Sequence, residues 1–271
     1  MDGQSMRSTY SASSSVYEFV EEFGRTYHRY KEGIHRALDI GTGTGIWAVE
    51  FAEKHPEADV LGTDLSPIQP PFVPPNLHFE VDDIDDDWVY NEPFDYIHGR
   101  YILPSLKDPK TALKRIYDNL RPSGYVEIME TLMKIESADG SLDNTVIPRW
   151  HHLLLDDIKR MGRPDPMVPL WLEQLVTDAG FVNVTVKKFA VPINTWARGD
   201  EQKIRGAMMM INLLEAAQGI TMFICTKVWG WSQEDVELFL VQVRADLKNK
   251  AHHGYVPIIC VYAQKPLDTY Q

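Results

Sequence analysis

The glycine-rich segment at residues 38–47, LDIGTGTGIW, constrains the fold of this chain more than any other segment. Its apolar start is typical of a buried strand. Three glycines at alternate positions, Gly41, Gly43 and Gly45, then lead into residues that are typical of a helix. In open α/β sheets, a turn of this kind between a strand and a helix N-terminus binds the charged part of a ligand. The segment therefore predicts an α/β domain with a ligand site at this turn.

The spacing of the glycines and the residue upstream of them indicate which ligand binds. Dinucleotide-binding turns read G-x-G-x-x-G, whereas this turn reads G-x-G-x-G and has Asp39 two residues before it. A carboxylate there would repel a pyrophosphate but attract the sulfonium and ammonium groups of S-adenosylmethionine, whose own carboxylate suits a helix N-terminus. A P-loop is excluded, because no Gly-Lys-Ser/Thr follows. We therefore expect Asp39, Gly41, Thr42, Gly43 and Gly45 to bind S-adenosylmethionine.

Strands and helices alternate around this turn in the first half of the chain. The hydrophobic patterns predict helices at 45–54 and 105–120, the second ending in a turn at RPSG (121–124). The predicted strands are 36–41, 58–64, 77–82, 94–99 and 125–130. Such alternation indicates βαβ units and a mainly parallel sheet.

The second half of the chain has a different pattern, with more helix. Strands are expected at 181–189 and 255–266, the last one antiparallel beside the fifth. The expected helices are 142–162, 168–179, 200–224 and 232–249. We expect the segments 131–179 and 190–250 to form a cap and a wall for the substrate. A helix at 16–30 would make residues 1–33 an N-terminal lid on a domain spanning 34–271.

Three strand ends supply further candidate ligand-binding residues. Asp64, followed by Leu65, ends the second strand, where a carboxylate can accept both ribose hydroxyls of a nucleoside. At the end of the third strand, Asp83 could accept from the adenine amino group while the backbone of Ile84 meets the ring edge.

The fourth strand ends with His98, Gly99 and Arg100, at the sheet edge where ligands bind in open α/β folds. Backbone carbonyls there could hold the cofactor ammonium. Arg100 is either a structural ion-pair partner or a contact to cofactor or substrate.

The motifs together resemble the fungal LaeA-like methyltransferases. The similar segments are the glycine turn, EFGRTYHRYKEG, VLGTDLSPIQP, VPPN, FEVDDIDDDW, FDYIHGR, RPSGYVEIME, INLLEA and VWGWSQEDVELFLVQVRADLKN. The resemblance implies a Rossmann-like class I methyltransferase with a mainly parallel seven-stranded sheet, an antiparallel last strand and helical cap insertions. It also implies a role in fungal secondary metabolism, as a tailoring enzyme or as a regulator acting through a protein partner. A fold recruited for non-methylating chemistry, such as a cyclisation, is a third hypothesis.

Candidate residues outside the strand ends are less specific. Arg25 could pair with the methionine carboxylate of the cofactor, and Tyr27 or Tyr30 could cover the sulfonium; the alternative is aromatic packing of the N-terminal helix. If the acceptor needs a general base, the candidates are His98, His151, His152 and Glu130. No metal site is expected, because the acidic run at 82–87 is typical of a solvated loop and His151 and His152 do not share a helix face.

Composition limits the class of substrate that the chain can bind and the setting in which it works. The net charge of −12 and the lack of a Lys/Arg cluster disfavour direct binding of nucleic acid. No apolar run approaches the roughly 20 residues that span a bilayer. The two cysteines suggest a reducing, intracellular setting, cytoplasmic or nuclear. Six large apolar side chains of the second half favour either core and cap packing or a pliable apolar wall for a substrate: Trp196, Met208, Met209, Met210, Trp229 and Trp231. The residues expected to enclose a small, largely apolar or aromatic substrate are Trp150, Trp171, Trp196, Met208, Met209, Met210 and Phe223.

The lid hypothesis predicts the effect of a truncation. Deleting residues 1–30 should leave a folded domain that binds S-adenosylhomocysteine much more weakly than the full chain, because the aromatic cover is lost. Circular dichroism and calorimetry on the truncated protein test both parts. An unfolded product would show instead that this segment belongs to the core.

Overall fold

The structure, a computed structural model, describes residues 33–160 and 165–267. The chain divides into two units, Met1–Ile34 and His35–Gln271, and the second unit contains all the helices and strands discussed here. The expected helix at 16–30, with Arg25, Tyr27 and Tyr30, lies outside the described residues.

The second unit contains a mainly parallel sheet in the order β3-β2-β1-β4-β5-β8. Strands β1 to β5 run parallel, β8 runs antiparallel beside β5, and β7 pairs with the other edge of β8. This arrangement confirms the mainly parallel sheet with an antiparallel last strand. A two-residue strand, β6, was not expected and makes the described strands eight in number. The strands are β1 (Arg36–Ile40), β2 (Asp59–Asp64), β3 (Leu77–Val81), β4 (Phe94–Arg100), β5 (Leu120–Thr131), β6 (Glu136–Ser137), β7 (Val182–Pro192) and β8 (Gly254–Gln264).

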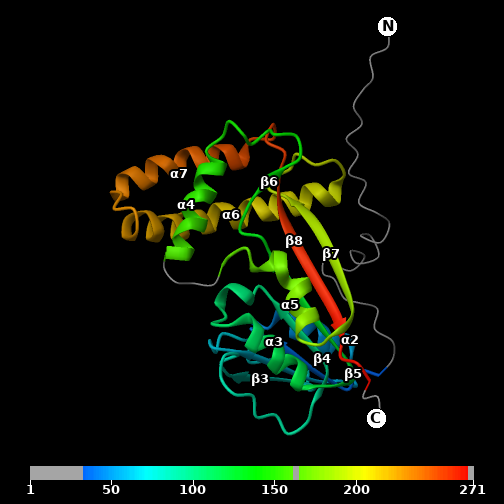
Figure 1. Cartoon of the computed structure of the whole chain (residues 1–271). Coiled ribbons are helices and arrows are strands. Elements are labelled where there is room, and N and C mark those ends of the chain that lie inside the picture. Colours follow the sequence, from blue (N-terminus) through cyan, green and yellow to red (C-terminus); the bar gives the residue numbers. More distant parts are fainter. Residues whose placement is uncertain (1–32, 161–164, 268–271) are drawn as a thin grey trace. The chain divides into compact units, whose positions relative to one another are not determined.

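The two faces of the sheet are covered by different helices. On one face, Trp47 and Phe51 of α2 (Ile46–Lys54) stack near Tyr96 of β4. On the other face, α3 (Pro109–Asp118) and α5 (Leu172–Asp178) pack over the apolar side chains of β1, β4 and β5 (Figure 1). Alternate residues of one strand therefore meet different environments, and polar groups of the sheet gather on the α2 face.

Two local predictions around β5 are wrong. The helix expected at 105–120 begins only at Pro109, because Asp108 caps it by accepting from the Lys110 N–H at 3.0 Å and a short 3₁₀ turn, Leu103–Ser105, precedes it. The sequence RPSG does not form a turn between elements but lies inside β5. Ser123 has a φ of 66° there, and the pairing with β4 shifts register, so the turn-forming residues make a bulge.

The remaining helices form a layer with its own core. The helical layer consists of α4 (Ile147–Arg160), α6 (Asp200–Lys227) and α7 (Gln233–Lys248), which gather around one end of β7 and β8 (Figure 1). Helix α5 instead packs Leu172 and Val176 into the core of the sheet, preceded by a 3₁₀ turn at Val168–Trp171. The cap expected at 131–179 is therefore too long.

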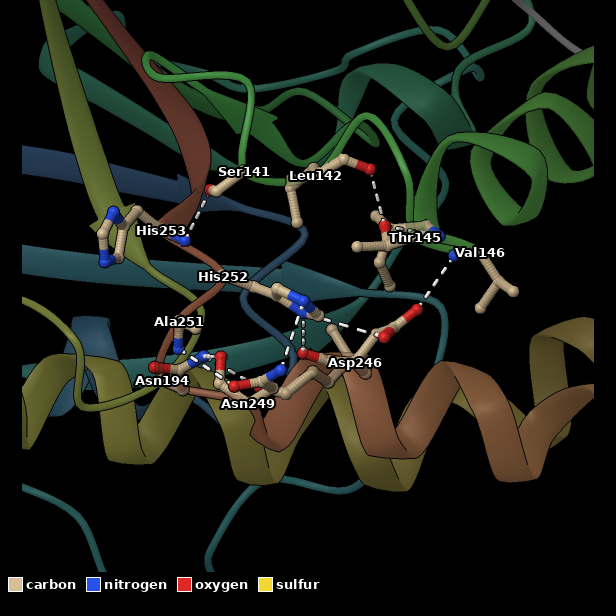
Figure 2. Close-up of polar contacts among 12 residues, drawn as sticks. Ser141, Leu142, Thr145, Val146, Asn194, Asp246, Asn249, Ala251, His252 and His253 are labelled. Atoms are coloured by element: carbon tan, nitrogen blue, oxygen red, sulfur yellow. Dashed lines mark hydrogen bonds and ion pairs between the residues drawn. The ribbon is translucent and has the colours of Figure 1, made fainter.

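A polar cluster connects the loops of the helical layer (Figure 2). Asp246, near the end of α7, accepts from the Val146 N–H at 2.9 Å, and its carbonyl contacts His252 Nδ1 at 3.0 Å. The buried Asn194 amide donates to the carbonyls of Leu247 and Asn249 at 3.0 and 3.2 Å. These contacts satisfy backbone groups where α7 ends and β8 begins, and thereby join the helical layer to the sheet.

Helix α6 is more apolar over its length than the search for uninterrupted apolar runs indicated. It is long and apolar enough, by length and composition, to cross a membrane, with a mean hydropathy of 1.4 over its most apolar window and 22% of that window buried. Core helices of globular proteins meet the same criterion, so this single helix is weak evidence for a membrane span. Ile204, Met208 and Phe223 are exposed on it, whereas Ala217 and Cys225 are buried.

The helical core predicts one stability effect. Trp150 Nε1 donates to the Thr221 hydroxyl at 2.8 Å, and both side chains are buried. Trp150→Phe should lower the free energy of unfolding by about 1–3 kcal/mol, because it leaves a buried hydroxyl without its donor. Urea denaturation measures this change. Trp171→Phe, at a half-exposed tryptophan, is the matched control and should change stability by less than about 0.5 kcal/mol; equal effects would refute the prediction.

Candidate active site

The glycine turn between β1 and α2 has the left-handed backbone that its sequence requires. Gly41, Gly43 and Gly45 have φ values of 63°, 58° and 76°, a region that side chains disfavour. A methyl group at Gly45 would lie 2.4 Å from Phe79 Cζ, whereas one at Gly43 would meet nothing within 4 Å. Gly45 therefore makes room for packing. Gly43 leaves open space where a side chain would lie, while its N–H and carbonyl are held by Asp64 and Gln69.

A buried carboxylate lies directly under this turn. Asp39 accepts from the Thr42 hydroxyl at 2.6 Å and contacts His98 Nδ1 at 2.7 Å, and both Asp39 and His98 are only 2% exposed. The His98 ring stacks on Trp47 with centroids 3.9 Å apart and planes 4° apart. Strand β1, strand β4 and the first turn of α2 therefore meet at one carboxylate.

Asp64 fixes the turn from the side of β2. Its Oδ2 accepts from the Gly43 N–H at 2.8 Å and its Oδ1 from the Ser66 N–H at 2.9 Å. Each carboxylate oxygen can accept more than one hydrogen bond. Asp64 can therefore hold the turn and still accept from a ribose.

The end of β3 has a similar local structure. The Asp83 carboxylate accepts from the Asp85 N–H at 2.9 Å, and Ile84 packs against the core of the sheet. Leu65, after β2, is exposed. These residues lie at the ends of neighbouring parallel strands, as the sequence predicted.

A pocket of about 220 Å³ opens at the turn and the end of β4. The residues that line it are Asp39, Gly41, Thr42, Gly43, Thr44, Ile46, Trp47, His98, Arg100 and Tyr101. Within the described part of the chain Arg100 has no carboxylate partner, and its guanidinium lies 5.9 Å from the Tyr101 ring centroid. This favours the ligand-contact interpretation of Arg100 over a structural ion pair.

A larger hollow, of about 430 Å³, lies in the helical layer and is lined by Arg149, Trp231, Asp235, Leu238, Phe239 and Gln242. It has no glycine turn. The smaller pocket, with space beside Gly43, a buried carboxylate and a cation that has no carboxylate partner among the described residues, fits the charged groups of S-adenosylmethionine better.

Comparison with known proteins establishes the family. Residues 15–186 match a family described as a methyltransferase domain, which is more than half of the chain. The chain is a member of this family. The similarity extends to the fungal LaeA-like proteins, so this is an S-adenosylmethionine-dependent, LaeA-like methyltransferase with a class I fold.

Two relatives and one structure illustrate the similarity. The methyltransferase pytC of Aspergillus terreus is 33% identical, covering 94% of this chain and 91% of its own length. The protein-methionine methyltransferase laeA of Emericella nidulans is 28% identical, covering 97% and 81%. The phosphoethanolamine N-methyltransferase 2 of Haemonchus contortus, solved with S-adenosylhomocysteine, has a TM-score of 0.52 at 18% identity; 94% of this chain matches 53% of that one. This last likeness shows the fold.

Two of the four candidate bases of the methyltransferase lie away from the pocket. His151 is buried in the helical core, where its Nε2 accepts from the Ile135 N–H at 3.1 Å and burial lowers its pKa to about 4. His152 lies on the exposed side of α4. Neither residue lines the pocket, which corrects their assignment as candidate bases.

The other two candidates have structural partners. His98 lines the pocket, but its Nδ1 is engaged by Asp39. Glu130 does not line the pocket; its Oε1 accepts the N–H groups of Ile102 and Leu103, both at 2.8 Å. The assignment of Glu130 as a base is therefore replaced by an anchoring contact. No group of three or more metal-ligating side chains occurs within the described residues.

The apolar residues proposed as a substrate wall do not line this pocket. Trp150 is buried in the helical core, Trp196 donates its Nε1 to the Gly254 carbonyl at 2.7 Å, and Met208 is exposed. Trp150 was expected in a substrate pocket but belongs to the helical core.

Sequence reasoning did not identify the pocket-lining residues Thr44, Ile46, Trp47 and Tyr101, nor the buried Glu127. Trp47 and Tyr101 line the pocket, and their positions, second in the helix after the turn and first after β4, could have indicated this. Glu127 is fully buried on β5 beside His98, and burial raises the pKa of its carboxyl group. A hydrophobic pattern cannot reveal such a buried acid.

Glu130 gives the methyltransferase a pH-dependent stability. Burial, partly offset by the two N–H donors, raises the pKa of Glu130 to about 7 in the folded protein. The unfolded chain has a pKa of about 4.3. A raised folded pKa contributes stability that is present below the unfolded pKa and is lost as the pH rises through about 7.

The prediction concerns the difference in the free energy of unfolding between wild type and Glu130→Gln. Because glutamine does not titrate, this difference (wild type minus variant) should fall by roughly 2–3 kcal/mol between about pH 5 and 8. Urea denaturation at several pH values measures it. Glu53→Gln, at an exposed position of α2, is the control and should run parallel to wild type. Parallel profiles of wild type and Glu130→Gln would contradict the prediction.

Proposed function

We propose that this methyltransferase methylates an oxygen, nitrogen or carbon nucleophile of a small, largely apolar or aromatic molecule of secondary metabolism. The observation that carries the proposal is the small pocket at the end of β4, where Trp47 and Tyr101 offer aromatic surface and Arg100 a cation that pairs with no carboxylate of the described residues. A net charge of −12 argues against nucleic acid as the substrate. The similarity to pytC, named a methyltransferase, supports the same class.

The cofactor contacts are part of this proposal. When bound, S-adenosylmethionine supplies an electrophilic methyl group. The Asp39 carboxylate and the backbone carbonyls of His98 and Gly99 suit the cationic groups of the cofactor. The N-terminus of α2 suits the carboxylate of the cofactor. Asp64 and Asp83 suit the ribose and the adenine. Arg25, Tyr27 and Tyr30, the expected lid residues, lie outside the described residues, and their part in the site is tested by the truncation of residues 1–30.

The protein contributes mainly by positioning. The Thr42–Asp39–His98 contacts hold the turn and the end of β4 in one geometry, so an acceptor beside Arg100 and Tyr101 meets the cofactor in a fixed orientation. Such positioning can contribute roughly 7–11 kcal/mol to the lowering of a barrier. A base is needed only if the nucleophile arrives protonated. Both cysteines are buried and neither forms a disulfide, which supports an intracellular setting, cytoplasmic or nuclear.

A second candidate is a regulator that acts through a protein partner. It is favoured by the similarity to laeA of Emericella nidulans, whose name specifies methionine in proteins as the acceptor. Transfer of a labelled methyl group to a panel of phenolic, carboxylic and amine metabolites, to histones, to nucleic acid and to the protein itself separates these functions. Labelling of small molecules supports the proposal. Labelling of protein alone, or no labelling without a partner, overturns it in favour of the regulator.

The assignment of Asp64 predicts a binding defect. Asp64→Ala should weaken binding of S-adenosylhomocysteine by about 1–3 kcal/mol, because the ribose hydroxyls and the Gly43 N–H lose their acceptor. Isothermal titration calorimetry measures the dissociation constant. Asp59→Ala, at the other end of the same strand and exposed, is the matched control and should bind like wild type. An unchanged constant for Asp64→Ala would refute the assignment.

A further inference from the structure

The turn that follows β4 is strained and forms one edge of the pocket. Tyr101 has a φ of 60°, a left-handed conformation that is unfavourable for a side chain of this size. Tyr101 and the preceding Arg100 both line the pocket. The position of both side chains therefore depends on contacts that keep this turn from relaxing.

Those contacts come from the end of β5. The Glu130 Oε1 accepts from the N–H groups of Ile102 and Leu103 at 2.8 Å each, and the Met129 carbonyl accepts from the Tyr101 N–H at 2.9 Å. Glu130 is fully buried, and its Oε2 has no hydrogen-bond partner within the described residues. The Glu130 carboxyl group and the turn that follows β4 therefore stabilise each other through these hydrogen bonds.

The turn also supports the glycine loop on the other side of the pocket. A methyl group added at Gly41 would lie 2.8 Å from Ile102 Cγ2, and one added at Gly99 would lie 2.7 Å from Ile102 Cδ1. The buried Ile102 side chain thus occupies the space that both glycines leave open. A shift of the Ile102 backbone would move the loop after β1 and the end of β4 together.

We propose that Glu130 is a positioning residue for the methyl-transfer site. It touches neither cofactor nor acceptor; it holds the strained turn at Tyr101 so that Ile102 sets the glycine loop and Arg100 and Tyr101 face the pocket. The inference rests on the proposed assignment of this pocket to the cofactor. It goes beyond a stabilising role, because the turn that Glu130 holds includes Tyr101 at the pocket and places Ile102 against Gly41 and Gly99.

The test compares binding of S-adenosylhomocysteine with stability. Glu130→Ala should raise the dissociation constant at least tenfold. Glu130→Gln keeps an oxygen that can accept both N–H groups and should bind within threefold of wild type. Asp246→Asn changes another carboxylate that accepts a backbone N–H, but in the helical layer; it should lower the melting temperature without changing this constant. Should Glu130→Ala not fold, Glu130→Asp, whose shorter side chain cannot reach both N–H groups, replaces it with the same tenfold expectation.

A double-mutant cycle tests the strained turn directly. Glycine adopts a φ of 60° without strain, so in a Tyr101→Gly background the Glu130→Ala change should raise the dissociation constant less than threefold. The same tenfold loss in both backgrounds would show that Glu130 does not act through this turn.

The result for Asp64→Ala separates failure of this inference from failure of the site assignment. If Asp64→Ala weakens binding while Glu130→Ala binds like wild type and only melts earlier, Glu130 is a structural residue and the inference is wrong. If neither variant changes the dissociation constant, the pocket is not the cofactor site and both proposals fall.

Discussion

The hydrogen bonds to the buried carboxylate of Asp39 hold the carboxyl edge of the sheet together. A buried carboxylate is costly unless it is hydrogen-bonded, and Asp39 obtains two partners: the Thr42 hydroxyl of the loop and His98 on β4. The stacking of His98 on Trp47 adds the first turn of α2. The loop, the strand and the helix therefore cannot move independently. The carboxylate that binds these elements together also lines the pocket, so the proposed cofactor site and the fold share one group.

The hydrophobic core of the sheet and that of the helical layer have different roles. The sheet and its helices, with α5 among them, place the strand ends that form the pocket, whereas α4, α6 and α7 pack around a second core. The polar cluster around Asp246 and Asn194 joins the helical layer to the start of β8, and β8 is hydrogen-bonded to β5, the strand that carries Glu127 and Glu130. The helical layer thus stabilises the strand whose acids lie behind the pocket.

The sequence predicted features that depend on local pattern. The strands, the antiparallel last strand and the acidic strand ends follow from alternation and spacing, and the structure contains them. The features it missed depend on tertiary partners. RPSG looks like a turn, but pairing between β4 and β5 absorbs it as a bulge. His151 and Glu130 look like bases, yet one accepts from Ile135 and the other anchors Ile102 and Leu103. The type of a polar residue shows which chemistry its side chain can perform, and only tertiary packing shows whether that side chain faces the pocket.

The three glycines of the turn illustrate the same distinction. All three have left-handed backbones. The lack of a side chain at Gly45 leaves room for Phe79, and the lack of one at Gly41 leaves room for Ile102, so these two glycines permit close packing. Only Gly43 has open space where a side chain would lie, and its N–H is already held by Asp64. The glycine spacing therefore reflects how tightly β3 and the turn after β4 approach the loop, more than the identity of the ligand. Ligand identity depends on charge: Asp39 beneath the loop disfavours a pyrophosphate and favours a cation, and Arg100 at the end of β4 suits an opposite charge.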